Sequence, residues 1–330
     1  MKKKNKAIYL LFLMPFVYFA TACFVVWLVK TSGIYPSGSD TMYHVYRGDY
    51  VYNAIKSGNW YPLYDPAWYN GVEILRYWSP FPAYVMAFCQ YLAGGSQFGA
   101  YLFYIGGVCF LGACVWPFIG RGFNRPYMGA FIGLLWFFMP NNLCAIFIEG
   151  NLARSLSMIF LPVFIYSVYK YLYNHKLRYI PLMVFTFLLM ELCHLGYAGM
   201  VAIAVIIYGI VYMIQKGRKK AVLDVVISMI FGFMLLGIWL VASLRGGITS
   251  LDNSENMANF FQNLWITINP FERLTRGFEY FYFGFAALVV IVFGILFGYK
   301  KSRTGFVTGF IILLMTCLLY TSPSPRDYAA

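Results

Sequence analysis

An uninterrupted apolar run, AIYLLFLMPFVYFATACFVVWLV, occupies residues 7–29, directly after the basic segment MKKKNK. About 20 apolar residues are enough for a helix to cross the hydrocarbon core of a bilayer. The run is longer than the apolar region of a cleavable signal peptide, and no small-residue cleavage site follows it. We therefore interpret residues 7–29 as a first transmembrane helix that also serves as a signal anchor.

The composition extends this interpretation to the whole chain. Its 330 residues are 61% hydrophobic and only 11% charged, whereas soluble domains are about 45–50% apolar and about 25% charged. This predicts an all-α, polytopic integral membrane protein. The net charge of +13 comes from basic clusters between apolar runs, which indicates membrane topology rather than nucleic-acid binding. The seven cysteines form no CxxC pair, so neither a disulfide framework nor a thiolate zinc site is indicated.

Apolar length sets the predicted topology. Nine segments are candidates for transmembrane helices: 7–29, 98–119, 127–147, 153–173, 180–195, 197–214, 221–243, 280–299 and 305–320. Residues 80–94 are also apolar, but they are short and open with two prolines. If they do not cross, every dense basic cluster lies on the cytoplasmic side, as the positive-inside rule requires. We therefore predict a cytoplasmic N-terminus in a multi-pass cell-membrane protein, with extracytoplasmic loops at 30–97 and 245–279.

The C-terminal sequence LLYTSPSPRDYAA interrupts the last apolar segment with a run of Ser and Pro. We expect residues 1–320 to form a single transmembrane domain that is truncated at its C-terminus. We interpret residues 321–330 as a non-native tail.

Ionisable residues gather in the first loop, in the stretch YPSGSDTMYHVYRGD of residues 35–49. The SGSD sequence predicts a helix start at which Ser39 or Asp40 caps free backbone N–H groups. Along that helix, Asp40, His44 and Arg47 follow spacings of four and three and share one face. Two interpretations stay open: a functional face, or a capping Asp40 with His44 and Arg47 in the lipid headgroup zone.

The segment that follows, AIKSGNWYPLYDPAWYNGVEILRYWSPFPAYVMA at residues 54–87, resembles the first outer loop of the GT-C class of integral-membrane glycosyltransferases. There the first span leads into an Asp, then a His and an Arg, a pattern like G-x-x-Y-P-x-x-x-P and an ending in Y-x-x-P. The chain is most similar to bacterial membrane proteins labelled 6-pyruvoyl-tetrahydropterin synthase-related, over about residues 7–200. The His-x-His zinc cluster of a pterin synthase is not present, so the label is not interpreted as chemistry.

The resemblance implies that Asp40 is the catalytic base, or a ligand to a divalent metal ion near the sugar. An inverting sugar transfer needs a carboxylate that takes the proton of the acceptor hydroxyl. His44, Arg47 and Asp65 are candidate substrate-binding residues of the same loop. Asp49 is expected on the opposite side of the helix from Asp40, which favours a surface acid over a second metal ligand.

Later ionisable residues are expected at the same membrane level. Glu149 and Arg154, in FIEGNLARSLSMIFLP, precede a span, where Arg154 either binds a phosphate or forms an ion pair with Glu149. His194, in MELCHLGYAG, is near the end of a span, three residues after Glu191. Ionisable residues there default to a functional hypothesis, and a buried histidine satisfied by a carbonyl is the alternative. We predict that Asp40, Glu149 and His194 converge.

Nucleotide sugars are not available outside the cell, so a site on that face favours a polyprenyl-phosphate-linked sugar as donor. The sequence therefore predicts a glycosyltransferase that passes a hexosyl or pentosyl group to a glycan, lipid or protein acceptor of the cell envelope. A transporter or flippase for a lipid-linked or anionic envelope substrate is the alternative, and a scaffold without substrate is the third hypothesis. The many Tyr and Trp of residues 43–78 fit stacking on sugars and an aromatic membrane belt equally well.

Overall fold

The computed structural model describes residues 2–36, 38–68, 71–76, 78–245 and 302–309, with the backbone alone given for residues 2–11, 140, 244 and 245. These residues are helical throughout, apart from loops and one isolated β-bridge between Asp65 and Val72. The predicted all-α class is therefore confirmed for the described residues. Contacts divide the chain into two compact units, and the first consists of Met1–Gly199 and Asp224–Ile248.

The first unit is organised around α4 (Gln97–Gly122). It packs against α1 (Lys2–Ser32), α5 (Pro126–Trp136) and α7 (Leu152–Asn174). Glycines permit the close approach of α4 and α5, because a Cβ built on Gly120 would lie 2.6 Å from the Cα of Gly129. Small residues at such crossings are typical of helices that pack within membranes.

Among the described residues, five helical segments are long and apolar enough to cross a membrane: Phe12–Ser32, Gln97–Gly122, Pro126–Ile148, Leu152–Asn174 and Leu195–Lys216. A sixth span results if α10 (Lys219–Leu235) and α11 (Gly237–Arg245), which are bent by 64°, are taken together. α8 (Tyr179–Cys193) is apolar but has only 15 residues. The predicted span at 280–299, the second loop at 245–279 beyond Arg245, and most of 305–320 lie outside the described residues, so the count of nine stays a prediction.

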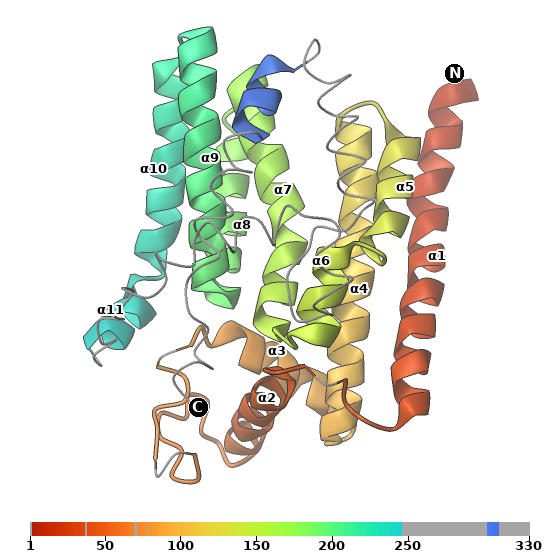
Figure 1. Ribbon diagram of the computed structural model, residues 1–330, viewed down its shortest axis with the longest axis vertical. Helices are drawn as coiled ribbons and strands as arrows, with labels where there is room; N and C mark the ends of the chain where they lie inside the picture. The colour runs from red at the N-terminus through yellow and green to blue at the C-terminus, as the bar shows by residue number, and fades with distance from the viewer. Residues whose placement is uncertain (1, 37, 69–70, 77, 246–301, 310–330) are drawn as a thin grey trace, which may run out of the picture. The chain divides into compact units, whose positions relative to one another are not determined.

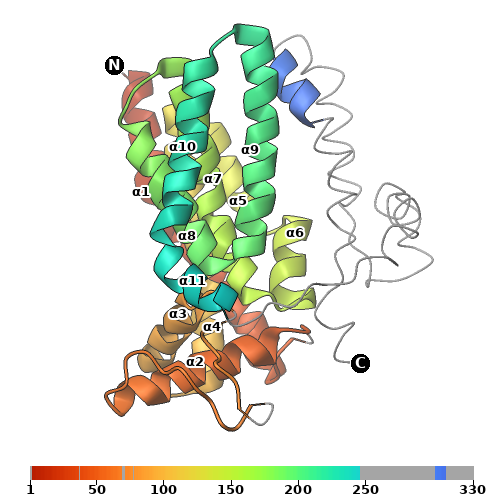
Figure 2. The same cartoon turned by 90° about the vertical axis from the view of Figure 1, so that its left-hand side faces the viewer.

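Two further helices lie together at one end of the first unit, below the long helices in Figures 1 and 2. α2 (Thr41–Lys56) packs against α3 (Phe81–Leu92), which also packs against α4. A helix of 12 residues rises about 18 Å, well short of the roughly 30 Å hydrocarbon core. α3 is therefore too short to cross, and it packs between α2 and α4.

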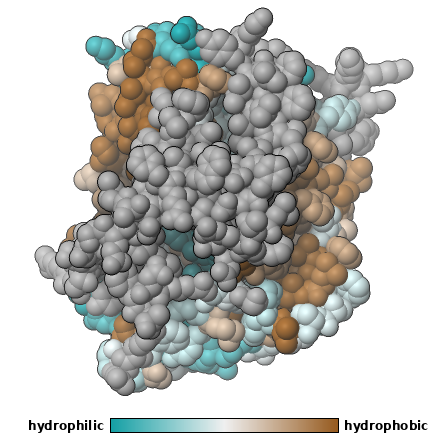
Figure 3. Space-filling view, in the orientation of Figure 1, coloured by the Kyte–Doolittle hydropathy of each residue, from teal (hydrophilic) through white to brown (hydrophobic). Residues whose placement is uncertain are grey.

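Two short elements connect α5 to α7: α6 (Pro140–Leu143) leads into a π-helical turn, η1 (Cys144–Ile148). A single residue, His194, separates the end of α8 from the start of α9 (Leu195–Lys216). In Figure 3, hydrophobic residues cover the right-hand flank, where Figure 1 places α1, and hydrophilic residues collect at the lower end. That distribution is expected for helices whose flanks face lipid.

Candidate functional site

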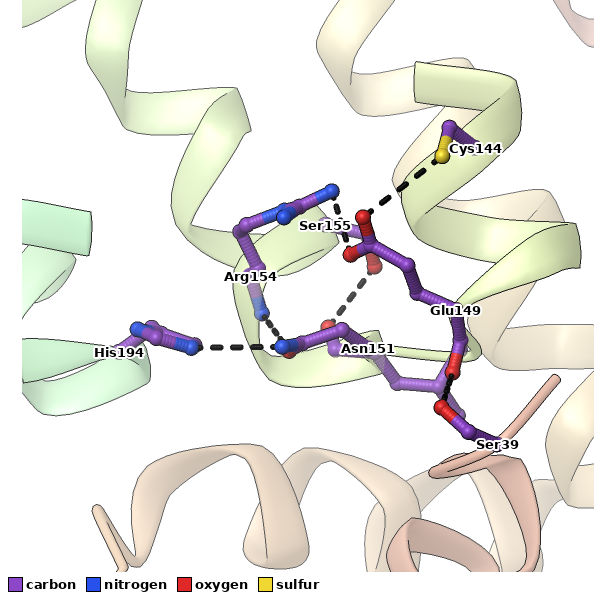
Figure 4. A network of polar contacts seen from close by, with 8 residues as sticks. Ser39, Cys144, Glu149, Asn151, Arg154, Ser155 and His194 are labelled. Carbon is purple, nitrogen blue, oxygen red and sulfur yellow. Dashed lines mark hydrogen bonds and ion pairs between the residues drawn. The ribbon is translucent and has the colours of Figure 1, made fainter. Parts of the chain in front are cut away.

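The start of α2 is fixed to the turn that precedes α7. The Ser39 hydroxyl donates to the carbonyl oxygen of Glu149 at 2.8 Å (Figure 4). The backbone N–H of Asp40 donates to the same oxygen at 2.9 Å. Two glycines make this approach possible. A Cβ on Gly38 would lie 2.6 Å from the Cα of Gly150, and Gly150 has a φ of +67°, which favours glycine. The backbone of Asp40 is therefore held beside Glu149.

The predicted capping role of this segment is wrong. Asp40 occupies the N-cap position of α2, but its side chain makes no capping hydrogen bond, and the Ser39 hydroxyl is turned towards Glu149 instead. The loop docks by backbone contacts between glycines, so the first turn of α2 is held without the carboxylate. The Asp40 side chain is half-buried and is not used as a cap.

Glu149 follows the π-helical turn η1, and such turns are often found at functional sites. Its Oε1 accepts a 3.6 Å contact from the Cys144 thiol, and its Oε2 lies 2.5 Å from Nη2 of Arg154. The two paired side chains are only 14% and 15% exposed, so the ion pair with Glu149, one of the two roles considered for Arg154, is present. The pKa of the Glu149 carboxyl is raised overall, chiefly by burial. The neighbouring Arg154 opposes this shift, and the nearby charge of Asp40 adds to it.

Two helix N-termini meet beside this ion pair, and each is capped by a side chain. The Asn151 Oδ1 accepts the N–H of Arg154 at 2.9 Å and caps α7. Nδ1 of His194 accepts the N–H of Tyr197 at 3.0 Å and caps α9 in the same way. Burial and, to a smaller extent, the charge of Arg154 lower the pKa of His194 from 6.5 to about 4, so the ring is neutral near pH 7.

The two capping side chains then present hydrogen-bond donors to each other. A neutral imidazole whose Nδ1 accepts a hydrogen bond carries its proton on Nε2. Nε2 of His194 lies 3.4 Å from Nδ2 of Asn151 (Figure 4), and that nitrogen is also a donor because Oδ1 is used by the cap. The buried Nε of Arg154 has no hydrogen-bond partner. We call Asn151, Arg154 and His194 the cap cluster.

His44 and Arg47 lie on the buried face of α2, with exposures of 7% and 1%. The alternative that places them in the headgroup zone is therefore wrong. Burial, followed by the charges of Arg47 and His194, lowers the pKa of His44 from 6.5 to about 3. Arg47 donates to the carbonyl oxygens of Trp78 and Ser79 at 3.1 and 3.4 Å, and its Nε has no partner.

Two other acids of the first loop have structural partners. The Asp65 carboxylate accepts the Tyr46 hydroxyl at 2.5 Å and the N–H of Ala67 at 3.0 Å. Asp65 is 2% exposed, and no contact joins it to the cap cluster among the described residues. Asp49 is half-buried and accepts from the amide of Gln90, on α3, at 2.6 Å.

The predicted convergence is observed in the following sense. Glu149, Asn151, Arg154 and His194 form one contact network, to which Asp40 is joined through the backbone. In the described part of the chain, no three His, Cys, Asp or Glu side chains are grouped to hold a metal ion. Asp40 and Glu149 lack a third ligand and Glu149 is engaged by Arg154, so the residues present do not fit a metal centre.

The cap cluster contains one residue that the sequence analysis missed, Asn151. The signal for it was available, because Asn directly before the apolar run LARSLSMIF is a typical N-cap arrangement. The capping role of His194 has no comparable signal. Histidine is not a common cap residue, and its partner Tyr197 contributes only a backbone N–H.

Most of the chain matches one known family of proteins. A family model described as "6-pyruvoyl-tetrahydropterin synthase related domain; membrane protein" matches residues 75–323, which is more than half of the sequence. Glu149, Arg154 and His194 lie inside the matched region, whereas Asp40, His44 and Arg47 precede it. No curated protein and no solved structure matches this chain.

Proposed function

This chain belongs to the family of 6-pyruvoyl-tetrahydropterin synthase related membrane proteins, and we propose that it is a membrane glycosyltransferase of the GT-C type. It transfers a sugar from a polyprenyl-phosphate-linked donor to a glycan, lipid or protein acceptor of the cell envelope. The site lies on the extracytoplasmic face, which the donor reaches through the surrounding membrane lipid. The proposal rests on the geometry of the cap cluster, not on the family's label.

One observation carries the proposal: the N-termini of α7 and α9 meet, and the side chains that cap them face each other as hydrogen-bond donors. Helix N-termini carry a partial positive charge and bind anions, phosphates among them. The guanidinium of Arg154, which is paired with Glu149 but whose Nε has no partner, adds a planar fork suited to phosphate oxygens. An oxyanion that bridges Nδ2 of Asn151 and Nε2 of His194 from one side would accept hydrogen bonds from both nitrogens.

The same arrangement supports glycosyl transfer rather than phosphate binding alone. Asp40 lies beside the cluster, with a carboxylate that makes no capping bond. It takes the proton of the acceptor hydroxyl while that oxygen bonds to the anomeric carbon. The anomeric C–O bond to phosphate breaks, and its electron pair stays on the phosphate oxygen. Donors aimed at this growing negative charge lower the barrier.

Glu149 has a positioning role in this scheme. Its carboxylate fixes the guanidinium of Arg154, and its carbonyl oxygen holds Ser39 and Asp40. A single residue thereby sets the distance between the base and the phosphate-binding side. His44 is buried on α2, one turn after Asp40.

The direct test is transfer by purified protein in proteoliposomes, with a panel of polyprenyl-phosphate hexoses and pentoses and a cell-envelope extract as acceptor. Asp40→Asn should abolish transfer but keep binding of the polyprenyl phosphate and the detergent melting temperature. Asp49→Asn is the matched control, because Asp49 contacts Gln90 on α3; it should retain transfer. Normal transfer by Asp40→Asn would reject the role of Asp40 as base.

A transporter or flippase is the second candidate, and one observation favours it. Glu191 of α8 is 2% exposed, and its Oε2 has no hydrogen-bond partner. This oxygen faces α10, 3.6 Å from where a Cβ on Gly232 would lie. Buried carboxyl groups within spans often mark substrate or proton pathways. Movement of a labelled polyprenyl phosphate across the proteoliposome, lost in Glu191→Gln and retained in Asp40→Asn, would favour this candidate.

A further inference from the structure

Two tryptophan side chains of the first loop, Trp68 and Trp78, pack against Tyr43 next to the proposed site. The ring centroid of Tyr43, on α2, lies 5.3 Å from that of Trp68 and 5.9 Å from that of Trp78. The planes of Tyr43 and the two tryptophan rings are inclined by 57° and 65°. The three rings therefore form angled walls rather than a flat stack.

Neighbouring residues hold Trp68 and Trp78 in place. Tyr46 packs against Trp68 with centroids 4.6 Å apart, and its hydroxyl is bound by the buried carboxylate of Asp65. On the other side, Arg47 binds the backbone carbonyl oxygen of Trp78. Rings fixed before binding lose little conformational freedom when a ligand is bound, which favours affinity.

The position of these rings connects them to the cap cluster. The Tyr43 ring lies 5.7 Å from the ring of His44. The hydroxyl of Ser79, next to Trp78, donates at 3.0 Å to the carbonyl oxygen of Glu191, three residues before His194. The guanidinium of Arg47 lies 5.4 Å from the centroid of Tyr43. The backbone of Trp78 is held by Arg47, but the residue is 42% exposed. Part of its indole ring is therefore accessible to a ligand.

We infer that Tyr43, Trp68 and Trp78 form a platform that binds the sugar ring of the donor, while its phosphate lies at the cap cluster. This inference rests on the proposed function and adds the subsite for the transferred group. The C–H face of a pyranose is apolar and packs on an aromatic face, whose negative potential suits polarised C–H groups. A ring bonded to a phosphate at the cap cluster is within reach of this neighbouring wall.

A membrane belt explains these three rings less well. Belt aromatics sit singly at the interface with their polar ends towards the headgroups. Here both tryptophan rings contact Tyr43, which also lies 5.4 Å from the buried guanidinium of Arg47. Trp60 of the same loop is 71% exposed, and no contact joins it to the platform in the part of the chain that is described. It therefore provides the matched control for a merely interfacial tryptophan.

The test measures binding to the purified full chain in detergent, using short-chain prenyl-phosphate glucose, galactose and mannose and the same prenyl phosphate without sugar. The wild type should bind at least one sugar-bearing probe more tightly than the bare phosphate. Trp78→Ala should weaken that probe about tenfold and the bare phosphate less than about twofold. Trp78→Phe, which keeps an aromatic face, should recover most of the loss, and Trp60→Ala should change neither.

The outcomes separate this inference from the proposed function. Equal weakening of both probes by Trp78→Ala, or equal wild-type affinity for all probes, would overturn the platform and leave phosphate binding intact. Failure of the wild type to bind even the bare prenyl phosphate would instead reject the proposed function. The melting temperature shows whether Trp78→Ala still folds. If it does not fold, Trp78→Phe and Trp78→Leu are compared instead. The platform then predicts weaker binding of the sugar-bearing probe by Trp78→Leu alone.

Discussion

The backbone N–H of Asp40 donates to the carbonyl oxygen of Glu149 at 2.9 Å, which joins the first loop to the turn that starts α7. Through this contact, a carboxylate from one end of the sequence lies beside a buried ion pair formed much later in the chain. The contact depends on Gly38 and Gly150, whose backbones touch where any side chain would collide.

The glycine crossing gives a first prediction. Gly150→Ala should destabilise the protein strongly and displace Asp40, because the new Cβ would overlap the Thr41 hydroxyl and lie 2.6 Å from the Thr41 nitrogen. Gly217→Ala is the control, since Gly217 has nearly the same φ, +68°, but no atom within 4 Å of its Cβ position. The free energy of unfolding of Gly217→Ala should fall by only about 1–2 kcal/mol, because alanine is strained in the left-handed conformation. Melting in detergent measures both, and equal losses would contradict the crowding argument.

A second prediction separates capping from anion binding. Asn151→Asp should preserve the cap of α7, because a carboxylate oxygen accepts the Arg154 N–H equally well and a negative charge is favoured at a helix N-terminus. Its charge should nevertheless repel a phosphate and lower prenyl-phosphate affinity by about tenfold or more. Ser96→Asp, at the N-cap of α4 where Ser96 accepts from Gly99, should leave affinity unchanged. Normal phosphate binding by Asn151→Asp would remove the cap cluster from the site.

The third prediction concerns the two acid–arginine pairs. Glu149→Gln leaves the buried guanidinium of Arg154 without its carboxylate, and breaking such a pair costs about 3–5 kcal/mol. Glu73→Gln breaks the pair with Arg76, whose side chains are 37% and 27% exposed, and should cost at most about 1 kcal/mol. Inorganic phosphate or sulfate should raise the melting temperature of Glu149→Gln and leave that of Glu73→Gln unchanged. Similar melting curves for the two variants would contradict this ranking.

Acidification gives a fourth prediction. The pKa of His44 is lowered from 6.5 to about 3 in the folded chain, chiefly by burial. Folding therefore favours the neutral imidazole. The resulting contribution to the free energy of unfolding is fully present above pH 6.5 and is lost at lower pH, because the unfolded chain takes up a proton there and the folded chain does not. The melting temperature should fall between pH 6.5 and pH 4, and it should fall less in His44→Gln. His175→Gln, at the exposed C-cap of α7, should follow the wild-type curve.

A fifth prediction tests the support of the first loop. Tyr46→Phe removes the hydroxyl bound to Asp65 and leaves one oxygen of a buried carboxylate without that donor, at a cost of about 1–3 kcal/mol. Tyr91→Phe is the control, because Tyr91 is 72% exposed. Limited proteolysis within residues 57–68 should become faster in Tyr46→Phe alone. Unchanged cleavage would show that Asp65 does not depend on this hydroxyl.

Much of the fold could be predicted from the sequence because the relevant forces act locally. The apolar length of residues 98–119 predicts a span, and the structure has α4 there with boundaries within a few residues. The shortness of 80–94 likewise predicts α3. Helical spacing placed His44 and Arg47 on one face of α2, and both are buried there. The capping role of Asp40 was wrong, because the loop's tertiary contacts replaced a local bond.

The helical class and the membrane location could be inferred from the amino acids alone, since hydrophobic length and charge distribution require no knowledge of contacts. The ionisable residues near the helix ends were visible at the same level. The packing of the helices was needed to show that Asn151 and His194 face each other as donors and that the carboxylate of Asp65 binds Tyr46. Such pairings join positions far apart in the chain, so they depend on how the helices pack and not on any local pattern.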